Sequence, residues 1–222
     1  MSKKNPKVII VGNNPVLLEK SYGKSIDSYD IVIRINRCIT KELEKHTGTK
    51  TDIWATTYLT RQKYYDKDVN HEDHFIPNNF DELLAIWYRT PSTKKSLRHL
   101  PLKNQNTYTM SKNKKFRNNF PEYYKVQKNL KSEFDTGLLT ILTSTLFYKD
   151  ITIVGFDFSG KDNSFSKNVE GYYKNFIDED TLKIENQMWE SGKRLVDTTL
   201  ESKNKIIKEL ISAEKIKVVD CT

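Results

Sequence analysis

The sequence predicts an α/β fold, in which a mostly parallel β-sheet is covered by helices. Short apolar runs rich in β-branched residues recur along the 222 residues, and helix-like or polar segments separate them. This alternation is typical of parallel sheets, because parallel neighbours need long crossover connections. The runs are Val8–Val11, Ile31–Ile35, Asp52–Ala55, Leu84–Trp87, Ile151–Val154 and Ile216–Val219.

The first predicted strand ends in a turn that suits a nucleotide. Val11 is followed by Gly12, Asn13, Asn14 and Pro15. Glycine permits a tight turn, and asparagine amides beside the N-terminus of the next helix can meet a ribose or a phosphate. The turn is neither a Walker loop nor a Gly-x-Gly-x-x-Gly turn, and many α/β folds end their first strand with glycine. On local grounds alone, a purely structural turn is the stronger interpretation.

The second predicted strand contains one charged residue, Arg34, and Asn36 follows it two positions later. Because side chains alternate along a strand, both would point to the same face. A buried arginine there would require an anionic or acidic partner. Arg34 and Asn36 are therefore candidates for contact with an anionic ligand.

A second strand-edge site lies in the later half of the chain. An apolar run over 138–148 predicts a helix, and a strand follows it. A hydroxyl and free N–H groups at the helix start can bind a carboxylate or a phosphate, although an ordinary N-cap fits the same residues. Two such sites on one domain suggest a nucleotide donor. The candidates here are Asp135, Thr136, Gly137, Gly155, Phe156 and Asp157.

The chain is expected to form one Rossmann-like domain over 1–222, because it has the length of one α/β domain and lacks repeats and Gly/Ser linkers. Apolar residues at helical spacing over 200–214 predict an amphipathic helix before the last strand. Over 60–132 periodicity is weak and prolines recur, which indicates an insertion rather than sheet framework. We expect this insertion to contact the acceptor, the molecule that would receive the group carried by a nucleotide donor.

The net charge of +8 is concentrated in one segment. Between Lys94 and Lys131 there are eleven Lys or Arg residues and one acid, Glu122. Such a segment attracts an anionic acceptor, a lipid head-group surface or nucleic acid, and a solvated lysine-rich face is an equal alternative. Nucleic acid is the least favoured partner; it would be bound through Lys112, Lys114, Lys115 and Arg117.

The remaining composition indicates a soluble, cytoplasmic protein that could contact a membrane peripherally through 94–131. No apolar run approaches the roughly 20 residues of a membrane helix, and the first residues lead into a strand without the apolar region of a signal peptide. Cys38 and Cys221 are interpreted as free thiols, because neither their number nor their placement suggests a disulfide framework.

No metal cofactor is expected. The sequences Asp66-Lys-Asp68 and Asp178-Glu-Asp180 match the Asp-x-Asp metal sites of nucleotide-sugar transferases only superficially, because both lie among charges and neither follows a clear strand. His71 and His74 do not have the helical spacing of zinc hydrolases, so a solvated loop is the better interpretation.

Two stretches resemble the sialyl motifs of the sialyltransferases. Residues 20–36, with Gly48-Thr49-Lys50-Thr51-Asp52, resemble the large motif, and the segment from Asp135 to Phe156 resembles the small motif; together they cover about a third of the chain. Gly12 to Pro15 and Phe156 to Phe158 also resemble turns of bacterial sialyltransferases. The resemblance implies a GT-A-like variant of the Rossmann-like fold and a CMP-sugar donor.

The resemblance also implies roles for individual residues in donor binding. Asn13 and Asn36 would contact the phosphate and ribose of CMP. Four residues of the small motif would line the donor pocket: Thr136, Gly137, Gly155 and Phe156.

The expected catalytic residues depart from the family pattern. Tyr172 and Tyr173 resemble part of a His-Tyr-Tyr motif whose side chains approach the leaving phosphate, although a tyrosine pair is often only packed. The family's His-x-x-x-Glu motif stands here as Asp197-Thr-Thr-Leu-Glu201, so we expect Asp197 to replace the histidine. An unperturbed Asp has a pKa near 3.9 and is a weak base unless burial raises it. An N-cap of the last helix is the alternative for Asp197.

The leading hypothesis is metal-independent transfer of sialic acid from CMP-sialic acid to a glycan hydroxyl. CMP-Kdo is an alternative donor, because both sugars carry a carboxylate beside the anomeric carbon. A non-catalytic nucleotide- or glycan-binding protein is a second alternative, because the motif histidines are missing. Both an inverting reaction and a retaining one through a covalent intermediate remain open. Val8 and Tyr148 stand about where the family's disulfide would be, which fits a reducing compartment.

Overall fold

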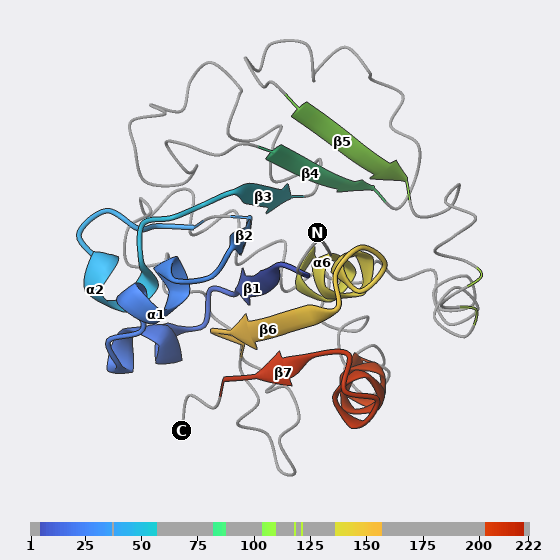
Figure 1. Ribbon diagram of the computed structural model, residues 1–222. Coiled ribbons are helices and arrows are strands. Elements are labelled where there is room, and N and C mark those ends of the chain that lie inside the picture. Colours follow the sequence, from blue (N-terminus) through green and yellow to red (C-terminus); the bar gives the residue numbers. More distant parts are fainter. Residues whose placement is uncertain are drawn as a thin grey trace, which may run out of the picture.

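The computed structural model describes residues 5–36, 38–56, 82–87, 104–109, 118, 121, 136–156 and 203–219. They form a sheet of seven parallel strands in the order β5-β4-β3-β2-β1-β6-β7, so the predicted α/β fold is confirmed (Figure 1). The strands are β1 Lys7–Val11, β2 Ile31–Ile35, β3 Ile53–Thr56, β4 Glu82–Trp87, β5 Asn104–Thr109, β6 Asp150–Val154 and β7 Lys217–Val218.

Helices connect these strands on both faces of the sheet (Figure 1). Between β1 and β2 the chain forms a 3-10 helix, η1, and a short helix, α1; the bounds of the named helices are η1 Pro15–Glu19, α1 Gly23–Asp27, α2 Glu44–Thr47 and α6 Thr136–Ser144. Residues 203–212 form the helix that precedes β7, which confirms the described part of the predicted amphipathic helix.

The core has two layers, one on each face of the sheet. One apolar cluster joins Val8 and Ile10 of β1 to α6 and to the helix before β7. The other joins Ile9 and Val11 of the same strand to η1 and α1. Because consecutive side chains of a strand point to opposite faces, a strand that is apolar throughout must be covered on both. Burial of Val8–Val11 on both sides therefore makes β1 an interior strand of the sheet.

The direction in which strands are added reverses beside β1. Strands β2 to β5 follow on one side, whereas β6 and β7 lie on the other. The helices η1 and α1, which follow β1, pack on one face, whereas the helix before β7 packs on the other. Ligands of open α/β sheets bind at such a switch point. The fold thus places the Gly12 and Gly155 turns at its expected ligand-binding edge.

The segment 60–132 contributes two strands, and the sequence predicted one of them, because β4, Glu82–Trp87, contains the run Leu84–Trp87. We expected an insertion rather than sheet framework, but β4 and β5 extend the sheet to its outer edge. The strand β5, Asn-Gln-Asn-Thr-Tyr-Thr, was missed because it lacks the apolar alternation of a buried strand. The predicted contact of this segment with the acceptor falls on residues outside the described ones.

The helix α6 begins two residues before the predicted apolar run. All nine residues of Thr136–Ser144 are buried, and Leu138, Leu139 and Leu142 belong to the cluster shared with β1. In the helix before β7, Ile207 and Leu210 are buried as predicted, whereas Ile211 is 40% exposed. Within the described parts of the chain, no helix is long and apolar enough to cross a membrane.

Candidate nucleotide-binding site

Two glycines bring the ends of β1 and β6 into backbone contact. The N–H of Gly12 donates to the carbonyl of Val154 at 2.8 Å, and the N–H of Asn14 donates to the carbonyl of Gly155 at 2.9 Å. A Cβ atom on Gly12 would lie 2.3 Å from the Gly155 oxygen. Gly155 itself has φ +70°, a conformation that favours glycine. The two turns therefore form one rigid unit at the switch point.

Replacing Gly12 with alanine is expected to lower the free energy of unfolding by about 1–3 kcal/mol, the usual cost of overpacking. The added methyl group meets backbone atoms of Gly155, so the two strand ends must separate. Chemical denaturation measures the change, with the exposed Ser25→Ala as the control. If the stability of the Gly12 variant matched that of the control, the two turns would not be in the contact described.

Asn14 caps η1 with its side chain. Its Oδ1 accepts a hydrogen bond from the N–H of Val16 at 2.8 Å, and the residue is buried. The proline at the first helical position, Pro15, also favours this helix start. The side-chain oxygen of Asn14 is thus used within its own turn, which favours a structural role over contact with a nucleotide.

Asn13 joins β1 to β2 through its side-chain nitrogen, and its side-chain oxygen is available to a ligand. Its Nδ2 donates to the carbonyl oxygen of Ile35 at 2.9 Å, which identifies the nitrogen of the amide. The Oδ1 atom is buried without a hydrogen-bond partner among the described residues. An amide oxygen only accepts, so it suits a hydroxyl or amino group, while the second hydrogen of Nδ2 suits a phosphate. A nucleotide offers all of these groups.

Asn36 follows β2 in a left-handed conformation with φ +50°. Its N–H donates to the carbonyl of Ala55 at 2.8 Å, and its own carbonyl accepts from Nε1 of Trp54 at 2.6 Å. Asparagine tolerates this conformation better than most residues. The prediction that Asn36 and Arg34 share a face is wrong in its premise, because strand alternation ends at Ile35.

Arg34 is fully buried and holds the loop before β3. Its Nε donates to the Lys50 carbonyl and the Thr51 hydroxyl, both at 3.0 Å, and its Nη2 donates to the Thr47 carbonyl at 2.7 Å. These three partners are neutral oxygens. The loop precedes β3, so it lies at the amino edge of the sheet, opposite the nucleotide edge. This geometry favours a structural role for Arg34.

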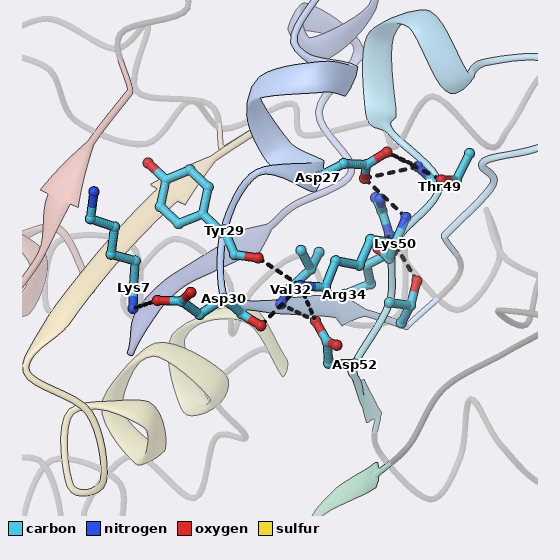
Figure 2. A network of polar contacts seen from close by, with 10 residues as sticks. Lys7, Asp27, Tyr29, Asp30, Val32, Arg34, Thr49, Lys50 and Asp52 are labelled. Carbon is cyan, nitrogen blue, oxygen red and sulfur yellow. Dashed lines mark hydrogen bonds and ion pairs between the residues drawn. The ribbon is translucent and has the colours of Figure 1, made fainter. Parts of the chain in front are cut away.

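Much of the large-motif resemblance lies in a polar network at the same amino edge (Figure 2). The Asp27 carboxylate accepts from the N–H groups of Thr49 and Lys50 at 2.9–3.0 Å. The Lys50 ammonium donates to the carbonyls of Tyr29 and Asp30 at 2.6 and 2.9 Å. These contacts join the turn before β2 to the loop before β3, so they fix the register of two central strands.

Asp52 completes this network. Its Oδ2 accepts from the N–H of Val32 at 2.7 Å and lies 3.5 Å from the Lys50 ammonium (Figure 2). Our sequence reasoning found no role for Asp27, Lys50 or Asp52 individually. Each of the three lies one to four residues before β2 or β3, where unpaired backbone N–H groups need acceptors.

The start of α6 lies in the interior of the protein. Thr136 and Gly137 are both buried, and the Thr136 carbonyl accepts from the Thr140 hydroxyl at 2.7 Å. Because α6 leads back to the start of β6, its N-terminus points toward the carboxyl edge of the sheet. Phe156 packs against the core cluster on that face. Asp135 and Asp157, predicted at the same edge, lie outside the described residues.

Cys38, which follows β2 closely, is buried, and burial raises the pKa of its thiol to about 12 despite the nearby positive charge of Arg34. At neutral pH the thiol is protonated and is a poor nucleophile or metal ligand. Among the residues that the structure describes, no cluster of three or more His, Cys, Asp or Glu side chains could hold a metal ion.

The sequence and the fold of this chain are similar to those of one known protein family. The model of glycosyltransferase family 29, the sialyltransferases, matches residues 2–198. The chain belongs to this family. The crystal structure of a mammalian sialyltransferase superposes with a TM-score of 0.51 over 97% of this chain and 69% of the other, at 19% identity, so the fold is shared.

Closer relatives of this sialyltransferase-family chain match over short segments. The CMP-N-acetylneuraminate-β-1,4-galactoside α-2,3-sialyltransferase of Rattus norvegicus is 46% identical over 66 residues, which are 28% of this chain and 17% of the rat protein. A β-1,6-galactosyltransferase of Arabidopsis thaliana is 48% identical over 44 residues, 20% of this chain and 11% of the plant protein. The matches thus span about a sixth or less of these relatives.

The catalytic candidates of this family member lie outside the described residues. They are Tyr172, Tyr173 and Asp197. The family match ends at residue 198, so it includes Asp197 but not Glu201. The structure thus brings together the Asn13, Asn36 and Gly155 turns at one edge, and the catalytic roles remain predictions from the sequence.

Proposed function

We propose that the protein transfers sialic acid from CMP-sialic acid to a hydroxyl group of a glycan. The observation that carries this proposal is the family match over residues 2–198, with Asn13 and its unused acceptor at the switch point of the sheet. The rat relative is named for CMP-N-acetylneuraminate, which supports the choice of donor. CMP-Kdo is the alternative donor with the same leaving group.

The ends of β1 and β2 provide neutral hydrogen-bonding groups for the CMP part of the donor. Asn13 is anchored to Ile35 through one hydrogen of its amide and offers a second hydrogen and an oxygen. Asn36, at the end of the neighbouring strand, would supply a second amide. We propose that such groups, with the start of α6, hold the phosphate without a metal ion. Activity in excess EDTA is the matching test.

The reaction requires a base and stabilisation of the leaving group. The acceptor hydroxyl attacks the anomeric carbon, the bond from that carbon to the phosphate oxygen breaks, and CMP leaves with the bonding electrons. We propose that Asp197 takes the hydroxyl proton and that Tyr172 and Tyr173 donate hydrogen bonds to the departing phosphate. Direct attack of this kind inverts the anomeric centre; a covalent intermediate would retain it.

The acceptor side and the cellular location are further parts of the proposal. The rat relative is named for a β-1,4-galactoside acceptor, so we propose a β-galactoside at the end of a glycan. The basic segment 94–131 would serve an anionic acceptor or a membrane surface, which fits a cytoplasmic protein with peripheral contact. Sedimentation with anionic vesicles at two salt concentrations distinguishes a membrane-bound from a free protein.

A donor panel tests the choice of sugar. CMP-sialic acid, CMP-Kdo and UDP-galactose are each incubated with the protein and mixed β-galactosides, and nucleotide release is measured. UDP-galactose belongs in the panel because the plant relative is named a galactosyltransferase. Release from CMP-sialic acid alone supports the proposal. Release from one of the other donors alone would show that this donor, and not CMP-sialic acid, is the substrate. CMP binding without release from any donor would favour a binding protein.

A further inference from the structure

Trp54 occupies an unusual position beside the proposed nucleotide site. Among the residues whose burial the structure describes it is the largest side chain that is fully buried, and it lies on β3 directly opposite Arg34 of β2. Neighbouring side chains at paired positions share one face of a sheet. Arg34 extends to the loop before β3, whereas the indole of Trp54 reaches the residue after β2. Its Nε1 donates to the carbonyl oxygen of Asn36 at 2.6 Å.

Asn36 is held by β3 through both of its backbone polar groups. Its N–H donates to the Ala55 carbonyl at 2.8 Å, and its carbonyl receives the Trp54 indole. With φ +50° Asn36 is in the left-handed region, which few residues other than glycine adopt but which asparagine tolerates, and the two hydrogen bonds stabilise it there. This backbone conformation sets the direction of the Cα–Cβ bond of Asn36. Hydrogen bonds with two adjacent residues of β3 therefore fix the direction in which the side chain leaves the backbone.

The hydrogen bond from Asn13 links the same strand end to β1. Its Nδ2 contacts the Ile35 carbonyl, one residue before Asn36. The ends of β1, β2 and β3 are thus connected in series through side-chain and backbone hydrogen bonds. A shift of Asn36 would move the group that orients Asn13, so the Trp54 contact affects both asparagines.

We propose that Trp54 is a positioning residue for the donor site: its indole N–H holds Asn36 in the left-handed conformation that presents the amide to the nucleotide. This inference rests on the proposed function, in which Asn36 contacts CMP. A buried indole N–H needs an acceptor in any case. Here the acceptor is the carbonyl oxygen of Asn36, so the hydrogen bond of Trp54 acts on a residue at the nucleotide edge.

A double-mutant cycle tests this role through CMP affinity. Trp54→Phe removes the indole N–H and keeps an aromatic ring, whereas Asn36→Gly removes the amide and keeps a residue that adopts φ +50° easily. Isothermal titration of CMP is expected to show affinity lowered about 3–10-fold by Trp54→Phe, the range for one hydrogen bond. In the Asn36→Gly background the same substitution is expected to change affinity less than 2-fold, because no side chain remains to be positioned.

The outcomes separate this inference from the proposed function. If Asn36→Gly weakens CMP binding but Trp54→Phe does not, or if the two losses are additive, Trp54 is not a positioning residue and the donor site stands. If the wild-type protein does not bind CMP, or Asn36→Gly leaves the affinity unchanged, the proposed contact of Asn36 is wrong and the inference fails with it. Trp87→Phe, on β4, serves as the matched aromatic control.

If the Trp54→Phe variant does not fold, a measurement on the wild-type indole group tests the same proposal. In the ¹⁵N-labelled wild-type protein, the indole signal of Trp54 is identified by elimination with Trp87→Phe and Trp189→Phe. That signal is expected to exchange slowly with solvent and to shift during a CMP titration. A rapidly exchanging signal, or one that CMP leaves unchanged, would overturn the proposal.

Discussion

Replacing Arg34 with methionine is expected to lower the free energy of unfolding by about 3–5 kcal/mol. The substitution keeps much of the side-chain volume but removes the donors to the Thr47 and Lys50 carbonyls and the Thr51 hydroxyl. A buried acceptor without a partner costs roughly 1–3 kcal/mol, and several lose theirs together. Urea denaturation of the variant and wild type measures the difference.

Two variants sharpen this test. Arg34→Lys keeps the charge but has one ammonium in place of a planar fork, so an intermediate loss is expected. Lys45→Met, on the exposed surface of α2, is the control for removing a positive charge. If Arg34→Met were as stable as wild type but bound CMP weakly, Arg34 would contact the donor after all, as the sequence first suggested.

Replacing Asp197 with asparagine is expected to lower turnover by roughly 10²–10⁴-fold, the usual contribution of positioned proton transfer. The affinity for CMP is expected to stay unchanged, because the base acts on the acceptor hydroxyl and not on the nucleotide. Steady-state turnover and CMP titration of the same preparation measure the two quantities. A variant with near-normal turnover would remove Asp197 from the mechanism.

Glu201→Gln is the matched comparison, because this carboxylate lies four residues later and outside the family match. If Asp197 is the base, the Glu201 variant retains most of its turnover. If the large loss falls on Glu201, this residue takes the place of the family histidine. If both variants lose CMP affinity and stability together, the two carboxylates support the fold, and the cap interpretation of Asp197 is the correct one.

The sequence predicted the central sheet well because β1, β2, β3 and β6 are buried on both faces. Their apolar, β-branched runs are strong signals, and the glycine turns mark their carboxyl ends. The polar strand β5 was missed because an edge strand needs no apolar alternation. The run Leu84–Trp87 predicted a strand within 60–132, but no local pattern shows that this segment forms the outer edge of the sheet, since that follows from long-range pairing.

The sequence predicted where the candidate site lies but not which of its residues have structural roles. The resemblance implied donor contacts for Asn13 and Asn36, and strand alternation added Arg34, whereas the structure separates Arg34 from the two asparagines. Asn13 and Asn36 lie at the carboxyl edge of the sheet, and the Arg34 guanidinium reaches the loop at the opposite edge. The direction of a long side chain depends on tertiary contacts. The role of Trp54 was equally hidden, because its partner is a backbone carbonyl.

The central claim is transfer of sialic acid from CMP-sialic acid, and one measurement tests it directly. The purified protein is incubated with CMP-sialic acid and a β-galactoside in excess EDTA, and the glycan product is weighed by mass spectrometry. We expect a glycan heavier by one sialic acid residue, with one CMP released per product. An unchanged glycan, across acceptors and with metal restored, from protein that binds CMP would contradict it.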